Sequence, residues 1–200
     1  MNTQTIFAVL ATVLSISCFL PYLRDIFRRK TTPHSHSWLI WTLLQATGVL
    51  AMVHSGAGGG VASLIVGAVL CAFIFLLSLR YGTKNITVFD TVCLFGALIA
   101  IAVWLFLHNA LLSIIAVSLI DLLAFLPTFR KSYVEPHSET ISTYILSAGA
   151  DGCAILALST LSVTTSLYLI TLLITNSICA GIIWFRRAHI RNIASTEHVN

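Results

Sequence analysis

Charged residues are scarce in this sequence of 200 residues. Lys, Arg, Asp and Glu together make up 9% of the chain, whereas hydrophobic residues make up 58% and the mean hydropathy is +0.95. In a typical soluble domain about a quarter of the residues are charged. The shortage of charge therefore excludes an ordinary soluble domain and indicates a protein that crosses the membrane several times.

The longest uncharged segment covers residues 31–79, which contain no Asp, Glu, Lys or Arg. As a single helix this segment would be about 74 Å long, more than twice the roughly 30 Å of a hydrocarbon core. It must therefore turn back once, and its glycine-dense polar break is His54–Gly60. Similar reasoning places turns at 108–109 and 159–165. Seven membrane spans result, at about residues 6–23, 37–54, 61–79, 87–107, 110–129, 140–158 and 163–185.

The basic residues all follow the ends of odd-numbered spans. They are Arg24, Arg28, Arg29, Lys30, Arg80, Lys84, Arg130, Lys131, Arg186, Arg187 and Arg191. By the positive-inside rule we predict an outside amino terminus and a cytoplasmic carboxyl terminus in the cell (cytoplasmic) membrane, with the lipid bilayer as partner. The net charge of +4 reflects this orientation, and we expect no nucleic acid partner. Residues 1–5 lack a basic region, which indicates a retained first span rather than a signal peptide.

Motifs for metals, cofactors and catalysis are also lacking. The five cysteines all lie in predicted spans, which favours apolar packing over disulfides. His34, His36 and His137 could gather on the cytoplasmic face, but no cysteine or carboxylate completes a zinc-binding spacing. The sequence contains no nucleophile triad, phosphate-binding loop or dinucleotide fingerprint. We therefore expect no metal, no cofactor and no enzyme activity.

Two short motifs each occur twice. The pattern F-L-P-x-x-R stands at residues 19–24 and again at 125–130, and P-H-S stands at 33–35 and again at 136–138. Such repetition predicts a duplicated module. Two three-helix units can share one orientation only if a helix between them crosses back. We therefore predict an all-α membrane fold with seven helices: a first three-helix repeat at 1–80, an inverting linker helix at 81–108, a second repeat at 109–186, and a cytoplasmic tail at 187–200 that is disordered from Ala188.

This arrangement resembles the PQ-loop and SWEET-type transporter superfamily over nearly the whole chain, and small bacterial members most closely. Each predicted first helix carries a proline near its cytoplasmic end, followed by a basic loop. The glutamine that names the PQ motif is replaced by Tyr22 in the first unit and by Thr128 in the second, so no role of that glutamine is carried over. The resemblance implies a carrier that moves a small polar solute by alternating access. It leaves open a binding or sorting receptor of the same fold, and also a homo-oligomer.

Two carboxylic acids, Asp121 and Asp151, lie inside predicted spans, where translocon scales give a cost of about 2.5–3.5 kcal/mol for a charged carboxylate. Asp151 shares one helix face with Tyr144 and Ser147. The equivalent face of the second span presents a stripe that includes Trp41 and Gln45. We expect the two stripes to line a central site near the middle of the membrane. We assign solute contact to Asp151 and proton coupling to Asp121. Alternatively, protonated carboxyls hold neighbouring helices together.

Asn176 in the last span completes the predicted set of solute-binding residues, which comprises Trp41, Gln45, Tyr144, Ser147, Asp151 and Asn176. The position of Asn176 resembles that of the asparagine which SWEET-type carriers place on their last helix. A hydrogen bond to a neighbouring helix is the alternative role for Asn176, and an interfacial position is the alternative for Trp41. An intramembrane aspartyl enzyme is a remote alternative, because Gly149-Ala150-Asp151 lacks the second glycine of its usual motif.

Pro21 and Pro127 occupy equivalent places near the cytoplasmic ends of their helices. Proline has no N–H, so neither residue can donate a hydrogen bond to the carbonyl four residues earlier. We predict that both prolines are hinges that open and close the cytoplasmic mouth. A static kink that suits helix packing is the alternative.

Overall fold

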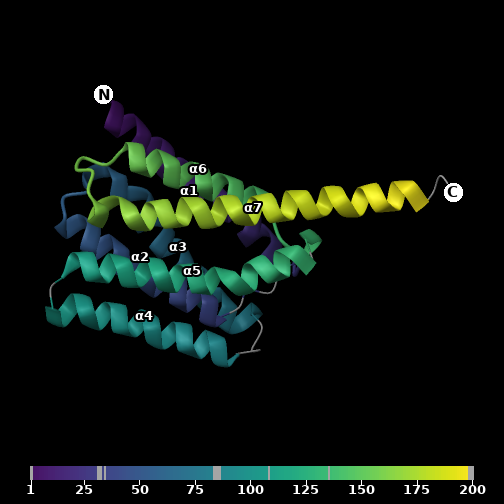
Figure 1. Ribbon diagram of the computed structural model, residues 1–200, viewed down its shortest axis with the longest axis horizontal. Coiled ribbons are helices and arrows are strands. Elements are labelled where there is room, and N and C mark those ends of the chain that lie inside the picture. Colours follow the sequence, from purple (N-terminus) through teal and green to yellow (C-terminus); the bar gives the residue numbers. More distant parts are fainter. Residues whose placement is uncertain are drawn as a thin grey trace.

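Long apolar helices account for most of the chain (Figure 1). The computed structural model describes the backbone of residues 2–30, 33, 35–82, 87–107, 109–134 and 136–197; the side chains at 90, 93, 100, 103–105, 107, 127, 131, 138 and 192–197 lie outside the description. Within these ranges there are seven α-helices and two 3-10 turns. They are α1 (Thr3–Phe27), α2 (Ser35–His54), η1 (Gly58–Val61), α3 (Ala62–Tyr81), α4 (Val88–Leu107), α5 (Ala110–Val134), η2 (Pro136–Ser138), α6 (Ile141–Leu156) and α7 (Val163–Glu197).

Each predicted span corresponds to one α-helix, so the all-α fold is confirmed. The turn predicted at the glycine-dense break is also present, because α2 ends at His54. Gly56 and Gly58 adopt positive φ angles of 77° and 61°, in the left-handed region that favours glycine. A Cβ atom on Gly58 would overlap the side chain of Ser159, in the loop between α6 and α7. Glycine at position 58 therefore both makes the turn and lets the two loops touch.

The carboxyl-terminal region differs from the expectation. We predicted a disordered tail from Ala188, but α7 continues to Glu197 and projects beyond the bundle (Figure 1). At 35 residues, α7 is about 52 Å long, well over the roughly 30 Å of a hydrocarbon core. The sequence contains no glycine or proline after Gly181. Polar composition alone does not end a helix, and without such a breaker α7 continues as a helix through this polar segment.

Five helical segments of the described part are long and apolar enough to cross a membrane. They are Thr3–Phe27, Ser35–His54, Gly58–Tyr81, Ala110–Val134 and Val163–Arg191. The apolar helix α6 is shorter, with 16 residues. These segments indicate a multi-pass membrane protein.

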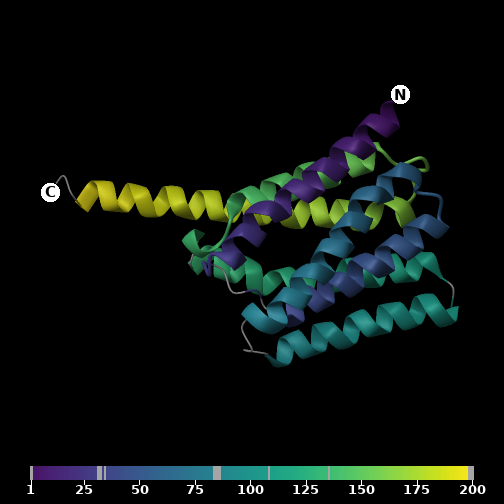
Figure 2. The same cartoon turned by 180° about the vertical axis from the view of Figure 1, so that it is seen from behind.

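The helices form one bundle with α4 at its edge (Figures 1 and 2). Helix α1 packs against α3 and α6, helix α2 packs against α3, α4 and α5, and helix α7 packs against α5 and α6. The first three helices contact the last three mainly through two interfaces, α1–α6 and α2–α5, with smaller contacts between α2 and α7 and between α3 and α6. The interior of the bundle lies between these two interfaces.

Apolar side chains cover the outside of the bundle, while several polar side chains are inside. Val69, Leu76 and Leu119 are each more than half exposed. In contrast, Asp121 and Thr175 are fully buried. An apolar exterior matches a hydrocarbon surrounding, and buried polar groups are the ones that hold membrane helices together or form sites.

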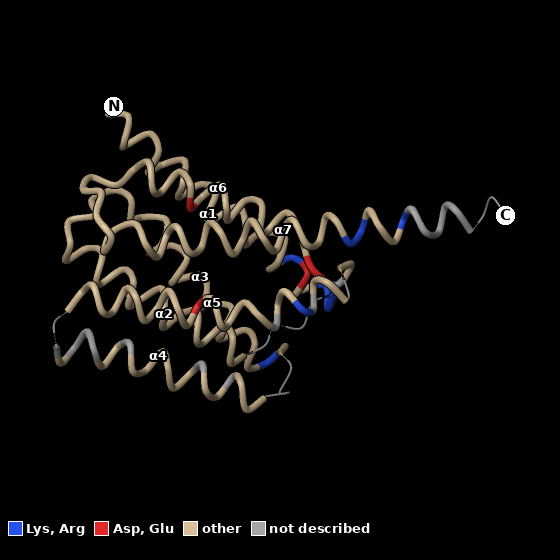
Figure 3. The backbone as a smooth tube through the Cα atoms, in the orientation of Figure 1, with Lys and Arg blue, Asp and Glu red and all other residues tan. Residues whose placement is uncertain are grey.

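The described lysine and arginine residues gather at one end of the bundle and on the projecting part of α7 (Figure 3). The described basic residues that follow the odd-numbered spans in the sequence thus lie at the same end of the bundle. At this end, Arg187 on α7 donates hydrogen bonds to the backbone carbonyls of Pro136 at 3.1 Å and Glu139 at 2.7 Å. The loop between α5 and α6 is thereby tied to α7.

The predicted orientation can be tested with two cysteine variants at exposed loop positions, His137→Cys at the basic end and Leu161→Cys at the opposite end. In right-side-out vesicles, a membrane-impermeant maleimide should label Leu161→Cys and leave His137→Cys unmodified until the membrane is permeabilised. The parent protein serves as the control for labelling of native cysteines. Labelling of His137→Cys in sealed vesicles would contradict the predicted orientation.

Candidate functional site: a polar pocket inside the helix bundle

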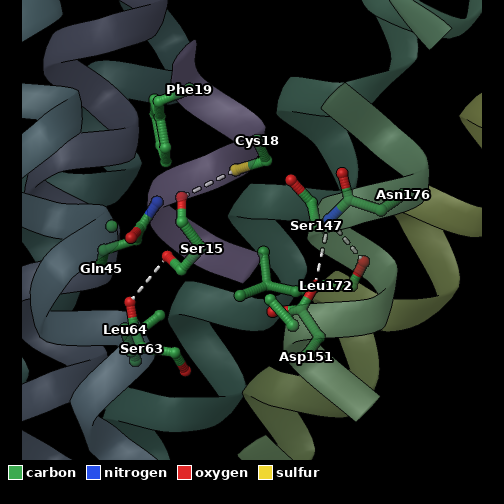
Figure 4. Close-up of a pocket in the computed structure, with 12 residues that line it drawn as sticks. Ser15, Cys18, Phe19, Gln45, Ser63, Leu64, Ser147, Asp151, Leu172 and Asn176 are labelled. Carbon is green, nitrogen blue, oxygen red and sulfur yellow. Dashed lines mark hydrogen bonds between the residues drawn. The ribbon is translucent and has the colours of Figure 1, made fainter. Parts of the chain in front are cut away.

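A pocket between five helices is lined by several polar side chains (Figure 4). Its cavity volume is about 70 Å³, well below the roughly 300–1,000 Å³ typical of ligand sites. Helices α1, α2, α3, α6 and α7 all contribute to it. The lining residues are Ser15, Cys18, Phe19, Gln45, Ser63, Leu64, Gly67, Ser147, Ala150, Asp151, Leu172 and Asn176.

Asp151 of α6 is held by an amide from α7. The Nδ2 atom of Asn176 donates a hydrogen bond to Asp151 Oδ2 at 3.2 Å and another to the Leu172 carbonyl at 2.9 Å. Asn176 is 8% exposed, so its side chain is held in a nearly closed environment. The amide thus fixes the carboxyl group on one side and leaves the rest of the carboxyl facing the pocket (Figure 4).

The opposite wall is built from small polar side chains of α1 and α3. Ser15 Oγ donates to the Ser63 carbonyl at 3.1 Å, which joins α1 to α3, and Cys18 Sγ donates to the Ser15 carbonyl at 3.0 Å. Gln45 of α2 donates to Cys71 Sγ at 3.3 Å, and its Oε1 lies against Gly67 in the space that a Cβ atom would occupy. Glycine at position 67 therefore makes room for the Gln45 amide at the edge of the pocket.

The structure brings four of the six predicted solute-binding residues together, namely Gln45, Ser147, Asp151 and Asn176. Trp41 and Tyr144 lie elsewhere, nearer the basic ends of α2 and α6. The Trp41 ring packs against the rings of Trp38 and Phe125, with centroid separations of 5.2 and 5.9 Å. Tyr144 Oη donates to Glu139 Oε2 at 3.0 Å. Their role in solute binding stays a prediction, since neither residue lines this pocket.

Several pocket residues were absent from the predicted set. Ser15, Cys18 and Phe19 come from one face of α1, with spacings of three and four residues, and Ser63 and Gly67 come from one face of α3. Ser63, Gly67 and Cys71 do form a small-residue stripe in the sequence, but such a stripe is equally typical of plain helix packing. Phe19 carried a signal, because it begins the repeated F-L-P motif.

Asp121 lies outside this pocket, in α5, and is fully buried. Neither of its carboxylate oxygens has a hydrogen-bond partner among the described atoms. The hydroxyls of Ser118 and Tyr168 and the indole N–H of Trp41 are likewise buried without a partner there. Asp121 interacts electrostatically with Tyr168 and with Asp151, so both acidic groups face the interior of the bundle.

A chain of aromatic rings separates the pocket from the basic end. Phe19, which lines the pocket, contacts Trp38 at 6.2 Å between ring centroids, and Trp38 contacts Trp41 at 5.2 Å. The chain continues through Phe125 to Phe129, which is 5.6 Å from Phe125. These rings join α1 and α2 to α5 by apolar contact.

The predicted hinge residues lie inside helices. Pro21 is within α1, two residues after Phe19 of the aromatic chain. Position 127 is within α5, but the Pro127 side chain lies outside the described part. The hinge role of both prolines stays a prediction.

In chemical terms the pocket offers one carboxyl group, two carboxamides, hydroxyls, a thiol and an aromatic ring. Over the residues that the structure describes, no group of three or more His, Cys, Asp and Glu side chains is placed to hold a metal ion. The groups present are suited to reversible binding of a small polar molecule.

Comparison with models of protein families, with curated protein sequences and with solved structures found no match. The interpretation of this pocket therefore rests on its own residues.

Gly48 of α2 provides a test of packing beside the site. A Cβ atom at this position would lie 2.7 Å from Cδ1 of Tyr168, a fully buried ring. We expect Gly48→Ala to destabilise the protein by about 1–3 kcal/mol through overpacking. Gly181→Ala is the matched control, since its Cβ atom would meet nothing within 4 Å and alanine favours a helix by roughly 0.5–1 kcal/mol. Thermal unfolding in detergent measures both, and equal melting temperatures would contradict the close packing.

Proposed function

We propose that the protein is a membrane carrier that moves a small polar solute by alternating access. The observation that carries the proposal is the polar pocket with Asp151, which lies between apolar helices and is lined by helices from both halves of the sequence. Packing alone would favour apolar side chains there, since a carboxyl group in a membrane interior is expensive. A site that must bind and release a polar molecule accounts for keeping such a group.

We further propose that the bundle consists of two three-helix repeats, α1–α3 and α5–α7, joined by α4. The contacts between helices support this division. In the first set α3 packs against both α1 and α2, and in the second set α7 packs against both α5 and α6. The interface α1–α6 between the sets has its counterpart in α5–α2. A twofold relation of this kind places the interior between the repeats, where carriers bind their solutes.

Closure of the cytoplasmic side is the conformational part of the proposal. The aromatic chain from Phe19 to Phe129 lies between the pocket and the basic end, which we assign to the cytoplasm. Pro21 leaves the carbonyl of Ser17 without its usual helix partner, so α1 is weakened next to Phe19. Bending at Pro21 would draw Phe19 away from Trp38 and open the pocket toward the cytoplasm. Pro127 has the same role in α5.

Flux measurements with purified protein in proteoliposomes test the carrier function. Vesicles are incubated with a defined mixture of small polar metabolites, and the internal content is measured by mass spectrometry. Vesicles with the parent protein should accumulate at least one compound above empty vesicles. Pro21→Ala should slow this uptake several-fold while leaving binding of the compound unchanged, because the helix regains a hydrogen bond and loses its weak point.

Binding measurements on the same compounds provide the control. A compound that raises the melting temperature of the protein in detergent without entering the vesicles would indicate the receptor alternative and contradict transport. Unchanged uptake in Pro21→Ala would contradict the hinge role of Pro21. A static kink that suits helix packing would then be the remaining interpretation.

We propose proton coupling through Asp121. This carboxyl group is fully buried without a hydrogen-bond partner among the described atoms, so burying it costs least free energy in the protonated, uncharged form. Its protonation can change when its surroundings change. An acid-outside pH gradient should drive uptake in the parent protein. In Asp121→Asn this driven uptake should be lost, while exchange of solute without a gradient persists. Asp25→Asn, which removes an ion pair with Arg24 at the basic end, is the control and should behave like the parent.

The alternative role of Asp121, as a group that only joins helices, gives a different result. Asparagine still forms hydrogen bonds, so the variant would either keep its gradient-driven uptake or lose driven uptake and exchange together through lower stability. Either result would contradict proton coupling at Asp121.

A further inference from the structure

The hydrogen-bond donors that line the pocket are mostly in use. Both N–H bonds of Asn176 Nδ2 have partners, Asp151 Oδ2 and the Leu172 carbonyl. The Ser15 hydroxyl donates to the Ser63 carbonyl and the Cys18 thiol to the Ser15 carbonyl. Gln45 Nε2 donates to Cys71 Sγ and has one further N–H. A ligand that needs many donors from the protein would therefore find few.

Acceptors, in contrast, remain available. The Asp151 carboxylate accepts one hydrogen bond from Asn176 and has capacity for others. The Oδ1 atom of Asn176, the Oε1 atom of Gln45 and the hydroxyl oxygen of Ser15 add neutral acceptors around the pocket. The hydroxyls of Ser63 and Ser147 can either donate or accept a hydrogen bond. A ligand rich in N–H groups would complement this set.

The charge of the pocket points in the same direction. Among the described residues, its lining includes the carboxyl group of Asp151 but no Lys, Arg or His. Asp121, the other acidic group in the interior, supplies no positive charge either. The described Lys and Arg residues lie at one end of the bundle and on the projecting part of α7 (Figure 3), and none of them lines the pocket. A bound cation would supply the positive charge that the protein does not.

We infer that the solute of this pocket is a small organic cation, with a primary ammonium or amidinium group and no carboxylate. The N–H groups would bind Asp151 and the Asn176 carbonyl oxygen. The apolar part would lie against Leu64 and Leu172, with Phe19 presenting an aromatic ring toward the positive charge. A carboxylate on the ligand would meet Asp151 without a basic side chain to pair with. This inference rests on the proposed function, since it names the solute class of the same site.

Four probes with the same four-carbon skeleton separate the relevant properties: n-butylamine, 1-butanol, butyrate and 4-aminobutyrate. Binding is measured by calorimetry at pH 7 with the full chain in detergent, after subtraction of the heat with empty micelles. Butylamine, which is charged at this pH, should bind saturably. The other three probes should bind at least about tenfold more weakly.

Variants locate the site of binding. Asp151→Asn keeps the shape of the side chain and should weaken butylamine binding by about tenfold or more, without strengthening butanol binding. Asp25→Asn at the basic end is the control with the same change in charge, and it should bind butylamine like the parent. If Asp151→Asn does not fold, the comparison of the four probes on the parent protein decides.

The outcomes separate this inference from the proposed function. Equal binding of butylamine and butanol, or tighter binding of butyrate or 4-aminobutyrate, would overturn the cation assignment. Tight butylamine binding that is lost in Asp151→Asn supports the cation assignment. If proteoliposomes then take up no amine, that second result contradicts only the transport function and not the cation assignment. Uptake of an uncharged solute that butylamine does not inhibit would overturn the assignment and leave the carrier function in place.

Discussion

The hydrogen bond between Asn176 and Asp151 is the interaction on which the arrangement of the interior depends. It joins α6 to α7 and satisfies one oxygen of a carboxyl group within an apolar bundle. Its second N–H binds the Leu172 carbonyl of its own helix, so the side chain of Asn176 is fixed at two points. One amide therefore holds the acid in place and also determines that the pocket presents acceptors.

If the two halves are repeats, their interiors have become different. The 106-residue offset of the F-L-P motif pairs Ser15 with Asp121, and the 103-residue offset of P-H-S pairs Gly48 with Asp151. Each acid thus corresponds to a small residue in the opposite half. Around Asp151 this leaves an open pocket with Ser63, whereas the space beside Gly48 is filled by the buried ring of Tyr168. On this pairing both acids belong to the second unit, and the first unit has a serine and a glycine at the equivalent positions.

Much of the fold could be predicted because membrane insertion depends on quantities that a sequence displays directly. The length of the apolar runs set the number of helices, and Gly56 and Gly58 marked the turn after α2. Polar composition was a poor guide for residues 188–197, where α7 continues as a helix. Hydropathy reports where a chain leaves the lipid, but the end of a helix depends on caps and breakers, which are absent there.

The sequence by itself determined the helices, their turns, the clustering of basic residues and the presence of two acids inside the bundle. Only the tertiary structure decided which side chains share the pocket. Periodicity places Tyr144 and Asp151 on one face of α6, but two helical turns separate them, and Tyr144 pairs with Glu139 instead. Likewise, the sequence gives no sign that Ser15 and Ser63 are more than packing residues. Only the contact between α1 and α3 brings them together at the pocket. The rotation and depth of each helix arise from contacts between helices, which no single helical segment encodes.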